Sequence, residues 1–256
     1  MADPARRLPS DPPALGCCRL SPDVVLIPLE DGTAGLLDLD GSFFGLSELA
    51  AAMLIGTLDQ NAPDTIERIA AEYNADVARV RADLSELLRT LRAKGLIRVS
   101  GDRSSVRLRT VIAIAVSSPV LKTLGLVRNP WLKAPALLAV ARLSFALAGW
   151  ARTVDAWQNC LRRSHVAAVG SERERLIDTI DSATRSSASG WPSIACKERA
   201  LCCWFMLHSA GIPARLVMGV QFVPFSGHCW CEVDDRILTD SPERCKAYTP
   251  VVHYDV

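Results

Sequence analysis

The chain has 256 residues, of which 49% are hydrophobic and 22% charged, as is typical of a soluble globular protein with one or two domains. Its 29 basic and 28 acidic residues leave a formal net charge of +1. This balance gives no electrostatic basis for binding nucleic acid or an anionic membrane surface.

The nine cysteines and the N-terminal segment indicate the compartment. An odd number of cysteines with two adjacent pairs argues against a secreted disulfide framework. Residues 1–13 are polar, rich in proline and without an apolar signal core, so we expect a disordered tail over residues 1–16. Together these features predict a protein of the reducing cytoplasm.

Residues 17–101 are predicted to form a first domain that opens with strands. Two β-rich runs, 24–27 and 35–39, are separated by a turn signal at 30–33, a pattern that is typical of a hairpin. Residues 96–99 can form a further extended segment at the end of the domain.

Three helical patterns lie between these extended segments. Ser47 is a suitable N-cap for the first, and Asp64 begins the second with Glu67 at capping-box spacing. The third runs over 76–94 with apolar residues on one face, and Gly95 supplies its stop. Strands with three short helices in this arrangement resemble a winged helix-turn-helix.

A loop at 101–105 separates this domain from a second one, predicted at 104–256, so the expected fold class is α+β. The expected elements of the second domain are apolar helices to about residue 163, a helix over 172–183, a flexible loop over 185–190, a helix over 194–209, and strands over 215–223, 228–233 and 236–239. We find no internal repeat.

Two apolar runs bear on membrane association. Residues 110–121 are too few for a spanning helix, which needs about 20 apolar residues. The run over residues 134–150 is longer, but Pro135 and Arg142 interrupt it. We interpret both runs as buried core helices.

Cys196 is the first candidate for chemistry, near the start of the helix that follows Pro192 and Ser193. A thiol there faces unpaired backbone N–H groups and the positive end of the helix dipole, which favours the thiolate. The same N–H groups can donate to an oxyanion. Cys202 and Cys203 lie mid-helix and are interpreted as packing residues. A cysteine near a helix start is more often structural than catalytic. A catalytic role for Cys196 therefore requires a base close to its thiol.

A histidine and an aspartate can supply those groups. The chain between the last two predicted strands has the pattern of a tight hairpin. If its loop has three residues, 233–235, then His228 faces Asp240 directly across the strands, whereas a two-residue loop puts them on opposite faces. The pair would give Cys196 a base and fix the tautomer of that base. Alternatively, His228 is a structural strand residue and Asp240 a turn former.

Zinc binding is the alternative chemistry of this region, because His228, Cys229 and Cys231 are close in sequence. In a strand, however, both cysteines project from the face opposite His228. No pair of cysteines has the C-x2-C spacing of structural zinc sites. We therefore predict no metal site.

From Cys196 onward the sequence resembles the B proteins of lasso-peptide biosynthesis, which are transglutaminase-like cysteine peptidases. The matching blocks, in order, are 196–201, 211–220, 228–233, 238–241 and 248–250. The resemblance implies a transglutaminase/papain-like domain in which Cys196 is the nucleophile, His228 the general base and acid, and Asp240 the residue that orients the histidine.

The sequence departs from the family pattern in two ways. Cys229 and Cys231 stand where small or apolar residues are usual, which leaves the chemistry unchanged. Gly190 stands where papain-like enzymes place a glutamine, so the second oxyanion donor is unassigned, with Trp191 and Trp230 as candidates.

The first domain independently resembles the PqqD-like leader-recognition element of peptide-modifying enzymes, through residues 43–47, 65–70, Tyr73 and 95–97. In that family the leader peptide lies as an added strand beside the sheet, against the third helix. The resemblance implies a leader-binding surface that includes Leu36, Leu37, Asp38, Leu39, Arg79 and Asp83. In the alternative interpretation these leucines face the core and the two charges are merely solvated.

The combined prediction is a leader peptidase that hydrolyses the leader–core bond of a ribosomally made precursor and needs no cofactor of its own. The resemblance implies that a partner, an asparagine-synthetase-like cyclase that consumes ATP, captures the core. Two alternatives stay open: a transglutaminase-like acyltransferase, in which an amine replaces water, and a non-catalytic scaffold that presents the precursor. The near-zero charge and the lack of a basic recognition helix argue against DNA binding.

Overall fold

The computed structural model describes residues 18–39, 41–59, 62–99, 118–161, 170–223 and 225–255. The chain divides into two compact units, residues 1–104 and 105–256, and both mix helices with sheet. The tail predicted at 1–16, the loop predicted at 101–105 and most of the apolar run 110–121 lie outside the described residues.

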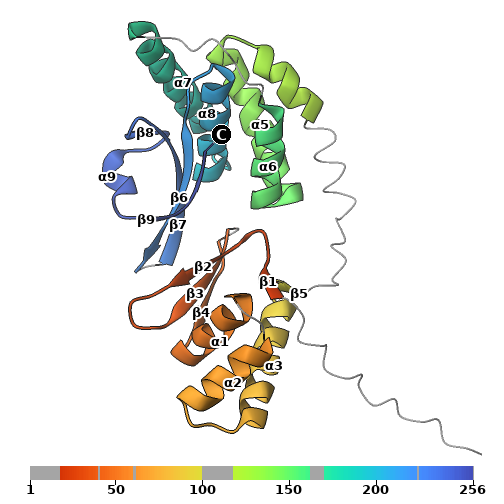
Figure 1. The fold of residues 1–256 in the computed structure, drawn as a ribbon. Coiled ribbons are helices and arrows are strands. Elements are labelled where there is room, and N and C mark those ends of the chain that lie inside the picture. The colour runs from red at the N-terminus through yellow and green to blue at the C-terminus, as the bar shows by residue number, and fades with distance from the viewer. Residues whose placement is uncertain are drawn as a thin grey trace, which may run out of the picture. The chain divides into compact units, whose positions relative to one another are not determined.

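The first unit combines two small antiparallel sheets with three helices (Figure 1). One sheet has the strand order β2-β3-β4, and β1 pairs with β5. The bounds are β1 (Cys18–Leu20), β2 (Val24–Pro28), β3 (Ala34–Asp38), β4 (Phe43–Leu46) and β5 (Ile97–Val99). Val24 pairs with Asp38, and Pro28 with Ala34, so the predicted hairpin is confirmed.

The three predicted helices are present as α1 (Glu48–Asp59), α2 (Ala62–Glu72) and α3 (Val77–Ala93). Ser47 accepts a hydrogen bond from the Ala50 amide at 3.4 Å, and Asp76 caps α3. Helix α2 begins two residues earlier than predicted, because Pro63 is well tolerated in a first turn. The winged helix-turn-helix assignment stays a prediction.

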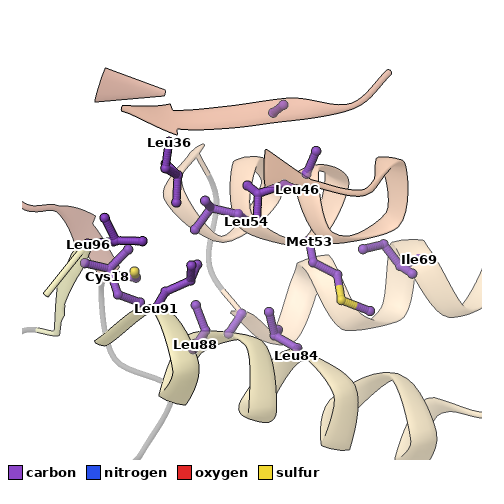
Figure 2. Close-up of a cluster of buried hydrophobic side chains, with 14 of the residues drawn as sticks. Cys18, Leu36, Leu46, Met53, Leu54, Ile69, Leu84, Leu88, Leu91 and Leu96 are labelled. Atoms are coloured by element: carbon purple, nitrogen blue, oxygen red, sulfur yellow. The ribbon is translucent and has the colours of Figure 1, made fainter. Parts of the chain in front are cut away.

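The core of this unit lies between the three-stranded sheet and the helices (Figure 2). Leu36 of β3, Leu54 of α1, and Leu84 and Leu91 of α3 are each 0% exposed. Burying each of these side chains stabilises the fold by roughly 1.5–3 kcal/mol. The apolar residues of α3 lie on one face, as the sequence indicated, and this face packs in the core against α1 and α2.

The substitution Leu84→Ala tests this core. We expect it to lower the free energy of unfolding by about 2–5 kcal/mol, because it leaves a cavity between α3 and its neighbours. The measurement is urea denaturation followed by circular dichroism. Val77→Ala in the same helix is the control, since Val77 is 43% exposed, and it should change stability by less than about 1 kcal/mol. Equal effects of the two substitutions would contradict the assignment.

The second unit places a four-stranded antiparallel sheet, order β8-β7-β6-β9, against several helices. The strands are β6 (Arg215–Phe222), β7 (Phe225–Val233), β8 (Arg236–Leu238) and β9 (Thr249–Tyr254). The helices are α5 (Pro130–Ala148), α6 (Trp150–Cys160), α7 (Ser171–Ser189), α8 (Cys196–Ser209) and α9 (Pro242–Cys245). Helix α8 packs on β6 and β7, whereas α9 lies on the other face, where Cys245 packs with Val217 and Trp230 (Figure 1).

Helix α7 corrects one prediction. It runs unbroken to Ser189, so the flexible loop predicted at 185–190 is wrong. Ala188 in this stretch and Thr184 just before it are buried, and α7 packs against α5 and α8. Burial of these small side chains overrides the weak helix propensity of a serine-rich segment. Strand β9 was also not predicted, because Pro250 and the adjacent pair Val251 and Val252 do not form an alternating pattern.

Helix α5 has the length and hydropathy of a membrane span. It nevertheless packs against α6, α7 and α8, and Leu137, Leu138 and Ala141 are buried there. Core helices of soluble proteins commonly have this composition. These contacts support the interpretation of residues 134–148 as part of a core helix, and Trp150, at the end of the run, is the buried first residue of α6.

Candidate active site

Cys196 is the first residue of α8, closer to the helix start than the sequence indicated. The N-cap residue is Ala195, which makes no side-chain cap hydrogen bond, whereas Asp76 caps α3 and Ser241 caps α9. The first-turn N–H groups of α8 therefore lack a side-chain cap. Together with the helix dipole they favour an anion at this position.

The segment before Cys196 is fixed from two sides. Glu198 is 3% exposed, and its Oε2 accepts a hydrogen bond from the Ala195 amide at 2.9 Å. Arg142 of α5 donates to the Ser193 carbonyl, and its Nη1 lies 4.0 Å from Oε1 of Glu198. These contacts define where α8 starts and therefore where the thiol lies.

His228 of β7 meets Asp240 as predicted. The imidazole is 2% exposed, and its Nε2 lies 2.9 Å from Oδ2 of Asp240. This is an ion-pair distance, but the direction departs from that of a straight hydrogen bond, and neither atom has another hydrogen-bond partner among the described residues. Such contacts are often poorly aligned without substrate. With Nε2 at the carboxylate, Nδ1 is the ring nitrogen left for a thiol.

The hairpin that brings His228 and Asp240 together differs from the predicted one. The β7–β8 register leaves a loop of two residues, Asp234 and Asp235, with φ of 47° and 65°. The predicted three-residue loop is therefore wrong. With this register alone, uninterrupted strands would place His228 and Asp240 on opposite faces of the sheet.

Thr239 reverses that outcome. It is 2% exposed and has φ of 68°, so β8 ends at Leu238 and the strand alternation stops before Asp240. A β-branched residue in this conformation costs roughly 1–3 kcal/mol. The Thr239 amide donates to Oδ1 of Asp181 at 2.7 Å, which helps to hold the turn. The sequence contains no local signal for this turn, since threonine is not a residue that favours positive φ.

The face of α8 that starts with Cys196 is directed at β7 and Asp240. Arg199, one turn further along, has its Nη2 3.6 Å from Oδ2 of Asp240. Cys203, about a turn beyond, has its thiol at hydrogen-bond range of the Cys231 thiol of β7. Residues at these spacings share one side of a helix.

Cys196 lies near Cys229, the residue that follows His228. Burial raises the pKa of the Cys229 thiol well above its ordinary value, and the Cys196 thiol adds to this effect. Strand β8 pairs with β7 only from Cys231 onward, so the β7 edge at His228 is not covered by β8. Cys196 is therefore near the residue that follows His228 on β7, and its role as the nucleophile stays a prediction.

Two arginines flank the carboxylate, since Arg199 and Arg244 each lie 3.6 Å from Oδ2 of Asp240. Burial acts to raise the pKa of Asp240, but the Ser241 amide, His228 and both arginines outweigh it, and the pKa is lowered. Burial lowers the pKa of His228, Asp240 opposes this, and the arginines reinforce it. The site therefore favours an ionised aspartate beside a neutral imidazole that can accept a proton.

His228 and its neighbouring cysteines point to opposite faces of the sheet, as predicted. The His228 ring packs against Trp230 and Tyr248, with centroids 6.0 Å and 5.0 Å away. Cys231 instead faces α8. Within the part of the chain that the structure describes, no group of three or more His, Cys, Asp or Glu could hold a metal ion.

The two candidate oxyanion donors differ. Nε1 of Trp230 donates to Oε1 of Glu232 at 2.6 Å, so this hydrogen is not free for an oxyanion. Trp191 is 44% exposed, five residues before Cys196, and its role stays a prediction. The first-turn amides of α8 are therefore the better-placed donors.

The leader-binding surface predicted on β3 is wrong. Strand β3 is the central strand, paired with β2 on one edge and β4 on the other, so no further strand can add to it. Leu36, Leu37 and Leu39 are buried, at 0%, 1% and 5% exposure, and Asp38 shares the paired strand. The hydrophobic pattern showed that this strand is buried but not that it lies in the middle.

Among the strands that the structure describes, β4 pairs only with β3 and so lies at the edge of its sheet. Lys94, at the end of α3, lies over the Phe44 ring at 5.2 Å from its centroid, so this edge is close to the third helix. Arg79 and Asp83 are exposed on α3, and a role for them in leader binding stays a prediction.

Two family models match the chain in separate places. Residues 23–97 match coenzyme PQQ synthesis protein D (PqqD), and residues 170–253 match the transglutaminase-like superfamily. The chain is a PqqD-like domain fused to a transglutaminase-like domain. This is the architecture of lasso-peptide B proteins, and the superfamily of the second domain includes cysteine peptidases. No curated protein and no solved structure gives a significant match to the chain.

The two matches agree with the geometry. The transglutaminase-like match spans α7 to β9 and so contains Cys196, His228 and Asp240. The PqqD-like match spans β2 to β5 and contains the outer edge of β4. A PqqD domain indicates a role in binding a precursor peptide.

The substitution Arg244→Gln tests the electrostatics of the site. Arg244 lowers the pKa of His228, so its removal should raise that pKa. The measurement is an NMR pH titration of the imidazole signals, with His228→Gln to assign them. Arg215→Gln, also a surface arginine but on β6, is the control and should leave the titration unchanged. An unmoved or lowered His228 pKa in the Arg244 variant would contradict the geometry.

Proposed function

We propose that this protein is a leader peptidase: it binds the leader of a ribosomally made precursor peptide and hydrolyses the leader–core bond with Cys196, His228 and Asp240. The observation that carries the proposal is the contact between His228 and Asp240 at 2.9 Å, beside a helix that begins with Cys196. A precursor-binding domain in the same chain supplies the substrate class.

In the first step Nδ1 of His228 accepts the Cys196 proton, and the thiolate attacks the scissile carbonyl carbon. The N–H groups at the start of α8 donate to the oxyanion. The C–N bond then breaks, His228 gives its proton to the departing amine of the core, and the leader is left as a thioester on Cys196. Asp240 keeps the Nε2 proton in place throughout.

In the second step water replaces the core. His228 accepts a proton from water, hydroxide attacks the thioester carbonyl, and the C–S bond breaks. The Cys196 thiolate leaves and recovers a proton from His228, and the leader departs with a new carboxylate. If an amine took the place of water, the product would be a leader amide, which its mass distinguishes from the hydrolysed leader.

Fusion of the two domains makes cleavage effectively intramolecular once the leader is bound, so a peptidase of modest power can act at one bond. The freed core then passes to a partner cyclase of the asparagine-synthetase type, which uses ATP, and both act in the cytoplasm. Neither formation nor hydrolysis of the thioester requires a cofactor on this chain.

The substitution Cys196→Ala tests the mechanism. The substrate is a synthetic precursor encoded by the reading frame beside that of this protein, and products are read by mass. We expect cleavage to fall by about 10³-fold or more, because the nucleophile is lost, while precursor affinity is retained. Cys202→Ala makes the same change in the same helix and should retain cleavage. A Cys196→Ala variant that cleaves at the original rate would refute the assignment.

We propose further that the leader adds to β4 as a strand. The backbone amide of Asp38 donates to the Ser42 carbonyl at 2.8 Å. By the alternation of an antiparallel ladder the Phe44 and Leu46 amides therefore face β3. By the same alternation the Gly45 amide faces the outer edge of β4. It is a donor of the kind that an added strand needs.

The pair Gly45→Pro and Gly45→Ala tests this site. Proline removes the outward N–H group, so leader affinity should fall about tenfold, in keeping with the loss of one or more main-chain hydrogen bonds. Alanine keeps the N–H group, and a Cβ there has its nearest neighbour, Cε1 of Phe43, at 4.0 Å. The measurement is fluorescence anisotropy with a labelled leader. Equal affinities of both variants would argue for a different surface.

A further inference from the structure

Helix α7 carries a row of charged side chains that contacts both ends of β8. Arg236, at the start of β8, pairs with Asp178 and lies 3.6 Å from Glu174. Asp181 and Arg185 contact the other end, after Leu238. The four helical positions follow at i, i+4, i+7 and i+11, so they share one face of α7.

At the C-terminal end of β8, Asp181 and Arg185 contact main-chain atoms. Oδ1 of Asp181 accepts from the Thr239 amide at 2.7 Å, and Nη2 of Arg185 donates to the Asp240 carbonyl at 2.8 Å. Nε of Arg185 lies 3.0 Å and 2.9 Å from the two Asp181 oxygens. The Asp181 and Arg185 side chains are therefore bound to each other, and together they hold the backbone of Thr239 and Asp240.

These two residues decide where the Asp240 carboxylate points. Thr239 has positive φ, which places Asp240 on the His228 side despite the two-residue loop. If Thr239 relaxed to an extended conformation, the alternation of β8 would continue and direct the carboxylate to the other face. An acceptor for the Thr239 amide and a donor for the Asp240 carbonyl both oppose that relaxation.

We propose that Asp181 and Arg185 are positioning residues of the candidate active site: they hold Thr239 and Asp240 in the turn that directs the carboxylate of Asp240 to His228. The expected loss of precursor cleavage rests on the proposed peptidase function, whereas the orientation of Asp240 toward His228 does not. Asp178 offers a matched control, because it ties the same helix to the same strand without touching the turn.

The experiment is an NMR pH titration of His228 in Asp181→Ala, Arg185→Gln and Asp178→Ala, with no substrate present. Asp240 raises the pKa of His228, so displacement of the carboxylate should lower that pKa in the first two variants. Asp178→Ala should titrate like the unmodified protein. Circular dichroism checks folding, and Arg185→Gln, which removes a single contact to the turn, serves if Asp181→Ala does not fold.

A rescue variant separates positioning from general stability. Glycine adopts positive φ without steric cost, so Thr239→Gly in the Asp181→Ala background should restore the His228 titration at least in part. Precursor cleavage, if present, should fall about 100-fold in Asp181→Ala through kcat, with KM within about twofold. An unmoved His228 pKa in both Asp181→Ala and Arg185→Gln overturns the inference. Altered titration without cleavage in any form of the protein would instead refute the peptidase function alone.

Discussion

The site depends on the contact between His228 and Asp240, and that contact depends on one unfavourable backbone conformation. The hairpin register alone would separate the two side chains, and the left-handed turn at Thr239 brings them together. A conformation with this cost persists only where its surroundings over-determine it. Here α7 supplies those contacts, so a helix that bears none of the reacting groups contributes to the geometry of the site.

Different contacts position Cys196, the proposed nucleophile. Cys196 owes its position to the start of α8, which Glu198 and Arg142 define, and its environment to the uncapped amides of the first turn. The flanking arginines keep positive charge near Asp240 and favour neutral His228. A neutral imidazole beside an uncapped helix start is suited to proton transfer from the thiol at the moment of attack.

Much of this could be predicted from the sequence. Helical periodicity located α3 and its core face, and the 24–39 hairpin was readable from its turn residues. The ordered blocks from Cys196 to Asp240 included His228 and Asp240, which the structure brings together. The approach of His228 to Asp240 was predicted for the wrong reason, since the loop has two residues and Thr239 compensates. A positive φ at threonine is imposed by Asp181, 58 residues away in sequence, so no local pattern reports it.

Other errors have the same origin in tertiary structure. Serine-rich residues 185–189 look like a loop, yet packing on α5 and α8 keeps them helical. The apolar strand β3 looked like a binding surface, yet its neighbours use both of its edges, and β4 lies at the edge of the sheet. In each case the local sequence gave the composition of the segment, but its structural role was decided by the elements that pack or pair with it.

We propose that the Cys196 thiol is the nucleophile of a leader peptidase. The most direct measurement uses a synthetic leader with a chloromethyl ketone in place of its C-terminal carboxylate, followed by trypsin digestion and mass spectrometry. We expect one covalent adduct, on the tryptic peptide 186–197, whose only cysteine is Cys196. An adduct on another cysteine, or none under conditions in which the precursor is cleaved, would contradict this proposal.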